Sequence, residues 1–313
     1  MEIILSFTIQ FALYMSVGWA AKRFHIVDDS FEKQLGNFLV NFALPFMIIR
    51  SLYTGFTWDH LRQYAAAILL ALVVLALSGA VGQACYFLMG RTYTGRAFRF
   101  GLLISNFTFM GMPLAENLLG TEGLSYFALF TVPIRIFYYC AVERLLSPRT
   151  RRESRLHALR QSITSPPVLG VFAGLLIAMT GIALPNAVEA VVSGLGSICS
   201  PMGMILCGMT LGGSSIRAIR QPRFLLMPLL RLAVLPACIA VIFWLLPIDI
   251  LFKQIAVLYT ALPCAGMMVV YTVRYEPDRA AWQDASVYVA VTNLLSVLSV
   301  PFWSWLILLM ASG

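Results

Sequence analysis

The chain has 313 residues, of which 60% are hydrophobic and only 12% are charged, with a mean hydropathy of +0.83. Soluble domains carry about 25% charged residues, so this composition excludes an ordinary water-soluble fold and predicts a polytopic membrane protein in a lipid bilayer. The net charge of +8 would suggest nucleic acid in a soluble protein. Here the basic residues collect in short connections, so no nucleic-acid partner is predicted.

Ten segments are long and apolar enough to cross a bilayer as helices, each of which needs about 20 residues. The first runs on as a full span without a small-residue cleavage site, so the sequence predicts no cleavable signal peptide. All connections are short except one. The predicted spans are residues 3–21, 34–54, 64–89, 97–119, 122–145, 166–185, 187–213, 223–246, 249–273 and 282–310.

Basic residues alternate from one connection to the next. Seventeen of the 22 Lys and Arg residues fall in the odd-numbered connections, whereas the opposite side holds only Arg50, Arg62 and Lys253. Because short cytoplasmic loops collect Lys and Arg, this pattern places the odd-numbered connections in the cytoplasm and both termini outside. It also supports the number of spans, since one missed helix would disrupt the alternation.

The long basic connection at 146–165 divides the chain into two halves, 1–145 and 166–313, with five predicted spans each. An odd number of spans per half gives the two halves opposite orientations in the membrane. The sequence therefore predicts an inverted repeat of five and five helices, joined by a cytoplasmic basic linker.

Prolines recur at matching places in the two halves. Pro45 of the second span corresponds to Pro201 of the seventh, and Pro113 of the fourth corresponds to Pro263 of the ninth. Interrupted segments at matching places of two inverted halves are the best sequence indication of a transporter binding site. We therefore predict that the fourth and ninth spans are broken and cross near the middle of the membrane.

The stretch 105–117 in the fourth span is unsuited to a continuous helix, since it combines Asn, Thr, Gly and Pro. Broken backbone in a membrane needs protein or a water-filled cavity around its freed polar groups. The N-terminus of a half-helix can hold a carboxylate through its free N–H groups. The backbone amides at 114–116 and 264–266 are the predicted donors. The candidate site residues of the two breaks are Asn106, Thr108, Pro113, Leu114, Thr260, Pro263, Cys264 and Ala265.

Four ionisable residues within the predicted spans are considered for a role. Arg135 is midway along the fifth span, and an arginine at mid-membrane costs at least about 2.5–3.5 kcal/mol. It is predicted to bind the substrate carboxylate, to form a gate by pairing with Glu116, or to fix its helix through a buried ion pair or carbonyl contact. Arg231 lies nearer the inner end of its span, where snorkelling is easier. Glu116 and Asp284 lie near span ends, where solvation is expected.

Three segments resemble the auxin efflux carrier family, which includes bacterial relatives of the plant PIN proteins. They are Asn37-Phe-Leu-Val-Asn-Phe-Ala-Leu-Pro-Phe-Met-Ile-Ile-Arg-Ser51, then Ser105-Asn-Phe-Thr-Phe-Met-Gly-Met-Pro-Leu114 followed by Gly120-Thr-Glu-Gly, and Ala261-Leu-Pro-Cys-Ala before a long last helix. The similarity runs in the same order over nearly the whole chain. The long cytoplasmic loop of many plant members is missing.

The resemblance implies a ten-helix inverted-repeat fold, as in bile-acid symporters and some sodium/proton antiporters. The first, second, sixth and seventh spans would form a scaffold, often the surface of a homodimer. The third to fifth and eighth to tenth spans would form a transport domain. The implied substrates are small organic anions, either carboxylates such as malonate or an auxin-like acid, and the implied location is the bacterial inner membrane.

The sequence therefore predicts a secondary transporter of organic anions that works by alternating access where the two broken spans cross. No ATP-binding loop, cofactor motif or metal-ligand spacing is present, so no cofactor or metal is predicted. An intramembrane enzyme needs paired acids, a histidine-rich metal set or an activated nucleophile, and the spans show none. A cation/proton antiporter or a sodium-coupled symporter on the same fold remains the alternative.

Overall fold

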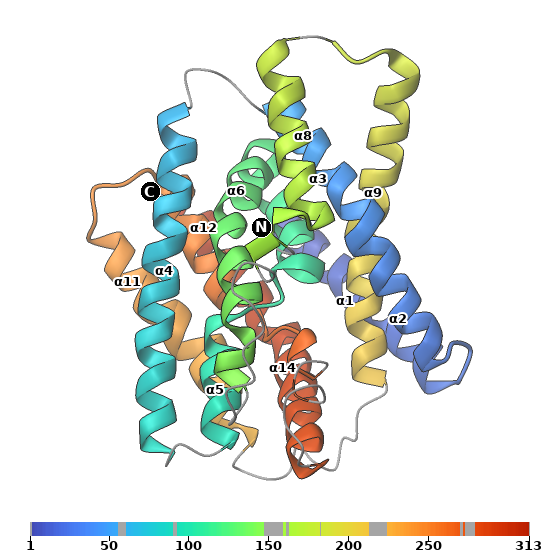
Figure 1. Cartoon of the computed structure of the whole chain (residues 1–313). Coiled ribbons are helices and arrows are strands. Elements are labelled where there is room, and N and C mark those ends of the chain that lie inside the picture. The colour runs from blue at the N-terminus through green and yellow to red at the C-terminus, as the bar shows by residue number, and fades with distance from the viewer. Residues whose placement is uncertain are drawn as a thin grey trace.

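The computed structural model describes residues 2–55, 61–89, 93–146, 159–160, 163–181, 183–212, 224–269, 272 and 279–312. In these ranges the chain forms helices and irregular connections, with one isolated β-bridge and no strand. Most of the long helices run roughly along one direction (Figure 1). The predicted all-helical class is confirmed. Most of the predicted linker at 146–165 lies outside the described residues.

One long helical element of the first half contains a bend, which lies at the boundary between two predicted spans. Gly120 adopts φ 70° and ψ −169°, a conformation that favours glycine, and it bends α6 between the predicted spans 97–119 and 122–145. The elements are α1 (Glu2–Arg23), α2 (Asp29–Phe38), η1 (Leu39–Ala43), α3 (Leu44–Gly55), α4 (Leu61–Leu88), α5 (Tyr93–Leu103), η3 (Phe107–Gly111) and α6 (Met112–Leu146).

The second half begins with two helices that are joined by a short connection. Gly181 ends the first of them in the left-handed conformation. The elements are α8 (Pro166–Thr180), α9 (Asn186–Gly212), α10 (Leu226–Leu229), η6 (Leu230–Val234), α11 (Leu235–Trp244), α12 (Ile250–Ala261) and α14 (Arg279–Ser312).

The outer faces of the helices are apolar. Leu69, Leu176, Val241 and Leu298 are 63% to 76% exposed, as expected of side chains that face lipid. Among the described residues, five helical stretches are long and apolar enough to cross a membrane: Asp29–Thr54, Gln63–Leu88, Asn186–Thr210, Leu226–Trp244 and Asp284–Leu309. The chain is therefore a polytopic membrane protein, while ten spans and the inverted repeat stay predictions.

Three wide π-helical turns precede prolines. The elements η1, η3 and η6 each end two residues before a proline, namely Pro45, Pro113 and Pro236. Proline lacks an N–H group and its ring collides with the carbonyl one turn back. A turn with i→i+5 hydrogen bonds moves that carbonyl aside. These prolines therefore widen their helices and do not end them.

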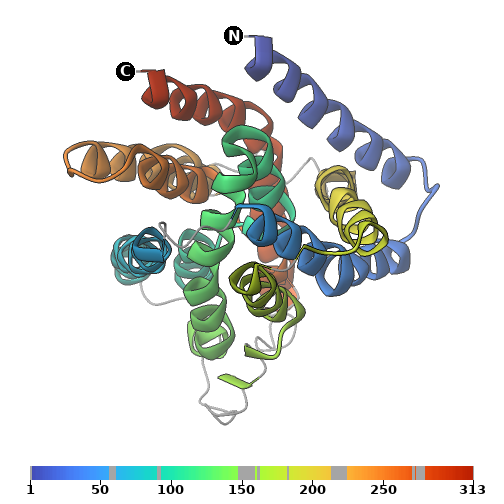
Figure 2. The same cartoon turned by 90° about the horizontal axis from the view of Figure 1, so that it is seen from above.

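The helices pack in two groups (Figure 2). Helix α9 packs against α1 and α3, and α3 also packs against α8; α4, α5, α6, α11, α12 and α14 form the rest of the bundle, which α3 contacts through α6. Glycines bring the backbones of α1 and α9 together. A Cβ atom on Gly208 would lie 2.0 Å from the carbonyl oxygen of Met15, and one on Gly18 would lie 1.9 Å from that of Ile205. Small residues permit such close helix packing in membranes.

Candidate functional site

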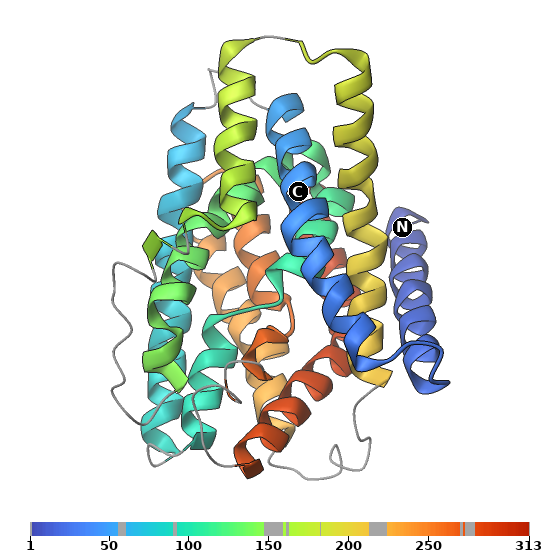
Figure 3. The ribbon, with the colours of Figure 1, turned by 45° about the vertical axis from the view of Figure 1, so that its right-hand side comes forward.

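Two interrupted helices meet inside the bundle. After α5 the chain is non-helical from Ile104 to Asn106, and after α12 it is non-helical from Leu262 to Ala265. The two pieces form the isolated antiparallel bridge between Ser105 and Cys264. The Asn106 amide donates to the Pro263 carbonyl at 2.8 Å, and the Ala265 amide donates to the Ile104 carbonyl at 3.3 Å. Figure 3 shows the first piece, in teal, passing through the middle of the bundle.

The break in the first half lies before the predicted place. The prediction of a break at Pro113 is wrong, because the helix restarts at Phe107 and runs through Pro113 and Leu114 without interruption. The wide turn of η3 accommodates the proline ring, so Leu114 to Glu116 are interior helix residues. The first amides of the half-helix, which have no partner within it, belong instead to residues 107–109.

The break in the second half does lie at the predicted proline. Leu262 is extended, with φ −70° and ψ 148°, because the residue before a proline avoids the helical conformation. Two of the candidate residues already have partners: the Ala265 amide bonds to Ile104, and the Thr260 hydroxyl donates within its own helix to Ala256 at 2.9 Å. The Cys264 thiol accepts from the hydroxyl of Thr292 on α14 at 3.4 Å.

Arg135 reaches the first turn of η3 from α6. Its side chain is buried, with the residue 6% exposed, and Nη2 donates to Oγ1 of Thr108 at 3.4 Å. The guanidinium carbon lies 4.9 Å from the centre of the Phe107 ring, within the range of a cation–π contact. The structure thus brings the predicted residues Thr108 and Arg135 together beside Asn106, at the N-terminus of the half-helix.

Asn106 faces α9. Its side-chain amide donates to Sγ of Cys207 at 3.4 Å, and a Cβ atom on Gly203 would lie 2.6 Å from the Phe109 carbonyl oxygen. Helix α9 therefore touches η3 closely, and the absence of a side chain at Gly203 permits this approach. The sequence patterns gave no indication that Cys207 or Gly203 adjoins the break.

Glu116 pairs with Arg50 of α3, and their side chains are 18% and 25% exposed. Both earlier expectations for Glu116 are wrong: it is neither simply solvated nor the partner of Arg135. Its carboxylate is turned toward α3, since α6 packs against that helix. Asp284 lies half-buried in α14.

Arg231 is fully buried, and snorkelling to the inner surface is therefore a wrong expectation. Its guanidinium donates from Nε to the Leu262 carbonyl at 2.9 Å, from Nη1 to Leu102 at 2.6 Å and from Nη2 to Tyr259 at 3.1 Å. Those carbonyls lie at the C-terminal ends of the two helices that stop at the crossing. Sequence reasoning found the buried charge but could not see these distant partners.

Comparison with known proteins identifies the family of the chain. The sequence profile of the membrane transport protein family, which is the family of the auxin efflux carriers, matches residues 4–304. The chain belongs to this family. It is also 23% identical over 302 residues to an uncharacterized transporter of Methanocaldococcus jannaschii, covering 93% of this chain and 95% of the archaeal protein. The protein is therefore a membrane transporter and not an enzyme.

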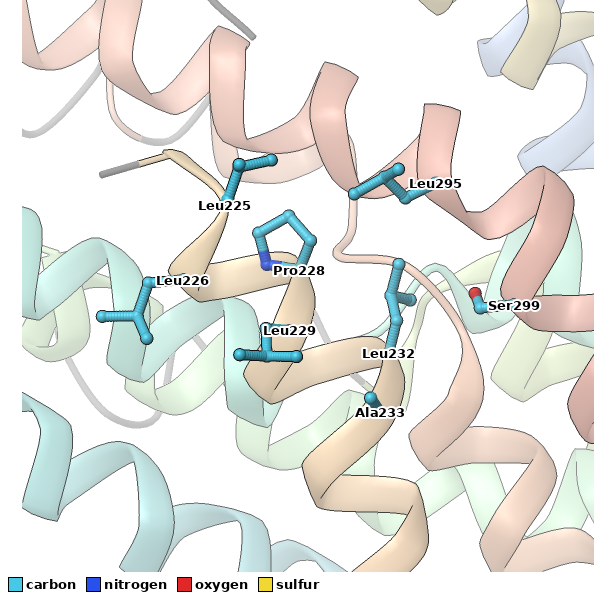
Figure 4. A pocket seen from close by; sticks show the side chains of 8 residues that line it. All are labelled: Leu225, Leu226, Pro228, Leu229, Leu232, Ala233, Leu295 and Ser299. Carbon is cyan, nitrogen blue, oxygen red and sulfur yellow. The ribbon is translucent and has the colours of Figure 1, made fainter. Parts of the chain in front are cut away.

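In this transporter, a groove of about 540 Å³ lies between the start of the eighth predicted span and α14 (Figure 4). Leucines dominate its wall, and none of its lining residues belongs to the crossing. The residues are Leu225, Leu226, Pro228, Leu229, Leu232, Ala233, Leu295 and Ser299. Ser299 contributes the one hydroxyl among these lining residues and none of them is charged, so the groove suits an apolar group better than a carboxylate.

Proposed function

We propose that the protein is a secondary transporter of small organic anions and that the substrate carboxylate binds at the crossing. The observation that carries the proposal is the position of Arg135. It comes from the fifth predicted span, yet it contacts Thr108 and Phe107 in the first turn of the half-helix that starts at the break. A cation and a helix N-terminus therefore converge on one point.

Arg135 and the N-terminus of the half-helix together suit a carboxylate. A helix N-terminus carries about half an elementary positive charge and presents amide N–H groups. The guanidinium adds a full charge and a planar fork that can bind both carboxylate oxygens. Its bond to the Thr108 hydroxyl is long, at 3.4 Å, so this one contact is weak. Asn106 would contribute its amide once its bond to Cys207 is broken.

The proposed movement divides the bundle at the contact between α9 and η3. Helices α1, α2, α3, α8 and α9 would be the scaffold, and would offer the surface for a homodimer. The remaining helices would move as the transport domain and expose the crossing to each side of the inner membrane in turn. Alternating access through relative motion of two helical units is the general behaviour of inverted-repeat transporters.

A cation/proton antiporter is the less favoured alternative. Exchange of a proton for a cation needs an acid at the crossing, and Glu116, the acid of α6 that is nearest to the break in sequence, is instead paired with Arg50. The arginine beside η3 would also repel a bound cation. The charges among the described residues at the crossing therefore support an anion as the cargo.

Uptake by proteoliposomes tests the proposal. We expect the wild-type protein to take up at least one of a panel of labelled carboxylates that includes malonate and indole acetate. Arg135→Ala should lower that uptake roughly 10- to 100-fold, since a hydrogen bond to a charged group contributes about 1.5–3 kcal/mol, while Arg135→Lys should retain part of it. The control is Lys253→Ala, which removes an exposed cation bonded to the Trp244 carbonyl and should change little. No uptake of any carboxylate would contradict the proposal.

A further inference from the structure

One guanidinium joins the two interrupted helices at their carbonyl ends. Arg231 comes from η6 and bonds to Leu102 near the end of α5, to Tyr259 in the last turn of α12 and to Leu262 just beyond it. The C-terminus of a helix leaves carbonyls without partners and carries about half an elementary negative charge. Two such ends converge here, and a single cation satisfies both.

The groups that balance the charge of Arg231 differ from those of an ordinary ion pair. Among the described residues it has no carboxylate within ion-pair distance, and its hydrogen bonds go to backbone carbonyls alone. Coordination by carbonyl oxygens with no carboxylate resembles the way a protein holds a bound alkali cation. Burial of an arginine is costly unless every donor is satisfied, and these bonds meet that need.

Neighbouring side chains hold the Arg231 guanidinium and its helix in place. The Tyr259 ring lies 5.7 Å from the guanidinium carbon, and its hydroxyl donates to the Leu103 carbonyl at 2.8 Å. The indole N–H of Trp303 donates to the Leu232 carbonyl, next to Arg231, at 2.6 Å. The end of α5, the end of α12, η6 and α14 are thus tied together around one buried charge.

In transporters with broken helices, unwound carbonyls and half-helix C-termini are the groups that coordinate a coupling sodium ion or proton. Here the corresponding carbonyls are occupied by a side chain. We propose that Arg231 is a built-in cation that takes the place of a coupling cation at the crossing, so that the transporter works without sodium. This inference rests on the proposed function, and Arg231 acts in it as a positioning residue that does not touch the substrate.

Removal of the side chain should create a site for a free cation. Arg231→Ala leaves the carbonyls of Leu102, Tyr259 and Leu262 unpaired, so we expect malonate uptake to fall at least about tenfold. Methylguanidinium at millimolar concentration should restore uptake by that variant. Arg231→Met fills the same volume with an uncharged chain, so methylguanidinium should have no effect on it. All solutions are matched in ionic strength with choline chloride.

Thermal unfolding of the purified protein supplies a readout that does not depend on the substrate. The melting temperature of Arg231→Ala should rise with methylguanidinium, because a ligand that binds only the folded state stabilises it. The melting temperature of the wild-type protein should be the same in sodium and in choline. If malonate is not transported, these measurements still test the site, so failure of the proposed function can be told apart from failure of this inference.

Three results would overturn the inference. The first is wild-type uptake or stability that depends on sodium. The second is undiminished uptake by Arg231→Ala without added cation. The third is equal rescue of Arg231→Ala and Arg231→Met by methylguanidinium. If Arg231→Ala does not fold, Arg231→Lys replaces it: retention of sodium-independent uptake by that variant supports the inference, and a new requirement for sodium contradicts it.

Discussion

Arg50, Arg135 and Arg231 lie inside the bundle and are held by three kinds of partner. Arg50 pairs with a carboxylate, Arg231 bonds to carbonyls at helix ends, and Arg135 contacts a hydroxyl and an aromatic ring. Each arrangement stabilises a charge that would be costly to bury alone. In the proposed function their roles differ, because Arg135 is the one of these three that lies at the N-terminal end of the half-helix, where an anion would be attracted.

The pair of Arg50 and Glu116 gives a prediction at the residue scale. Arg50→Met leaves a half-buried carboxylate without its cation and should lower the melting temperature of the purified protein. Adding Glu116→Gln removes that unpaired charge, so the double variant should have a higher melting temperature than Arg50→Met alone. The difference should correspond to about 1 kcal/mol or more in the free energy of unfolding. If the two losses simply add, the ion pair contributes no coupling and this account of it is wrong.

At this scale the sequence identified polar residues but not their partners. Asn106, Thr108 and Arg135 were predicted because they stand inside apolar segments, where polar groups are costly. The partners of Glu116 and Arg231 were not predicted. Arg50 is 66 residues from Glu116 in sequence, and Leu102 is 129 residues from Arg231. Hydrophobic periodicity places a helix in a membrane but does not specify which distant helix it faces.

At the scale of elements, two prolines with the same predicted role behave differently. Pro263 ends α12, because the residue before it becomes extended. Pro113 follows a widened turn and leaves its helix intact. Proline composition alone does not distinguish the two outcomes. The apolar segments matched the helices well, whereas the exact point of the first break depended on tertiary contacts such as the bridge to Cys264.

The packing of α1 on α9 gives a prediction at the element scale. Gly208→Val should lower the melting temperature by several degrees, because its side chain would meet the Met15 backbone and overpacking costs about 1–3 kcal/mol or more. Gly194→Val is the matched control on the same helix, since no atom lies within 4 Å of its added Cβ. Equal melting temperatures for the two variants would show that close backbone packing is unimportant.

At the scale of the whole molecule, polar contacts join the proposed scaffold to the proposed transport domain. Ser51 of α3 bonds to Ser125 of α6 at 2.7 Å. Asn117 of α6 donates to Oγ of Ser200 on α9 at 3.3 Å. If the two groups of helices slide past each other during transport, these contacts must break and re-form in every cycle.

A reversible cross-link between α6 and α9 tests whether the two groups of helices move against each other during transport. Asn117→Cys/Ser200→Cys places two thiols where side chains already touch, and malonate uptake is measured in proteoliposomes before oxidation, after oxidation and after reduction. The single variants, treated alike, control for the natural cysteines. If the crossing moves against the scaffold, uptake should be lost when the disulfide forms and should return when it is reduced. Full uptake by the cross-linked protein would contradict movement of the crossing against the scaffold.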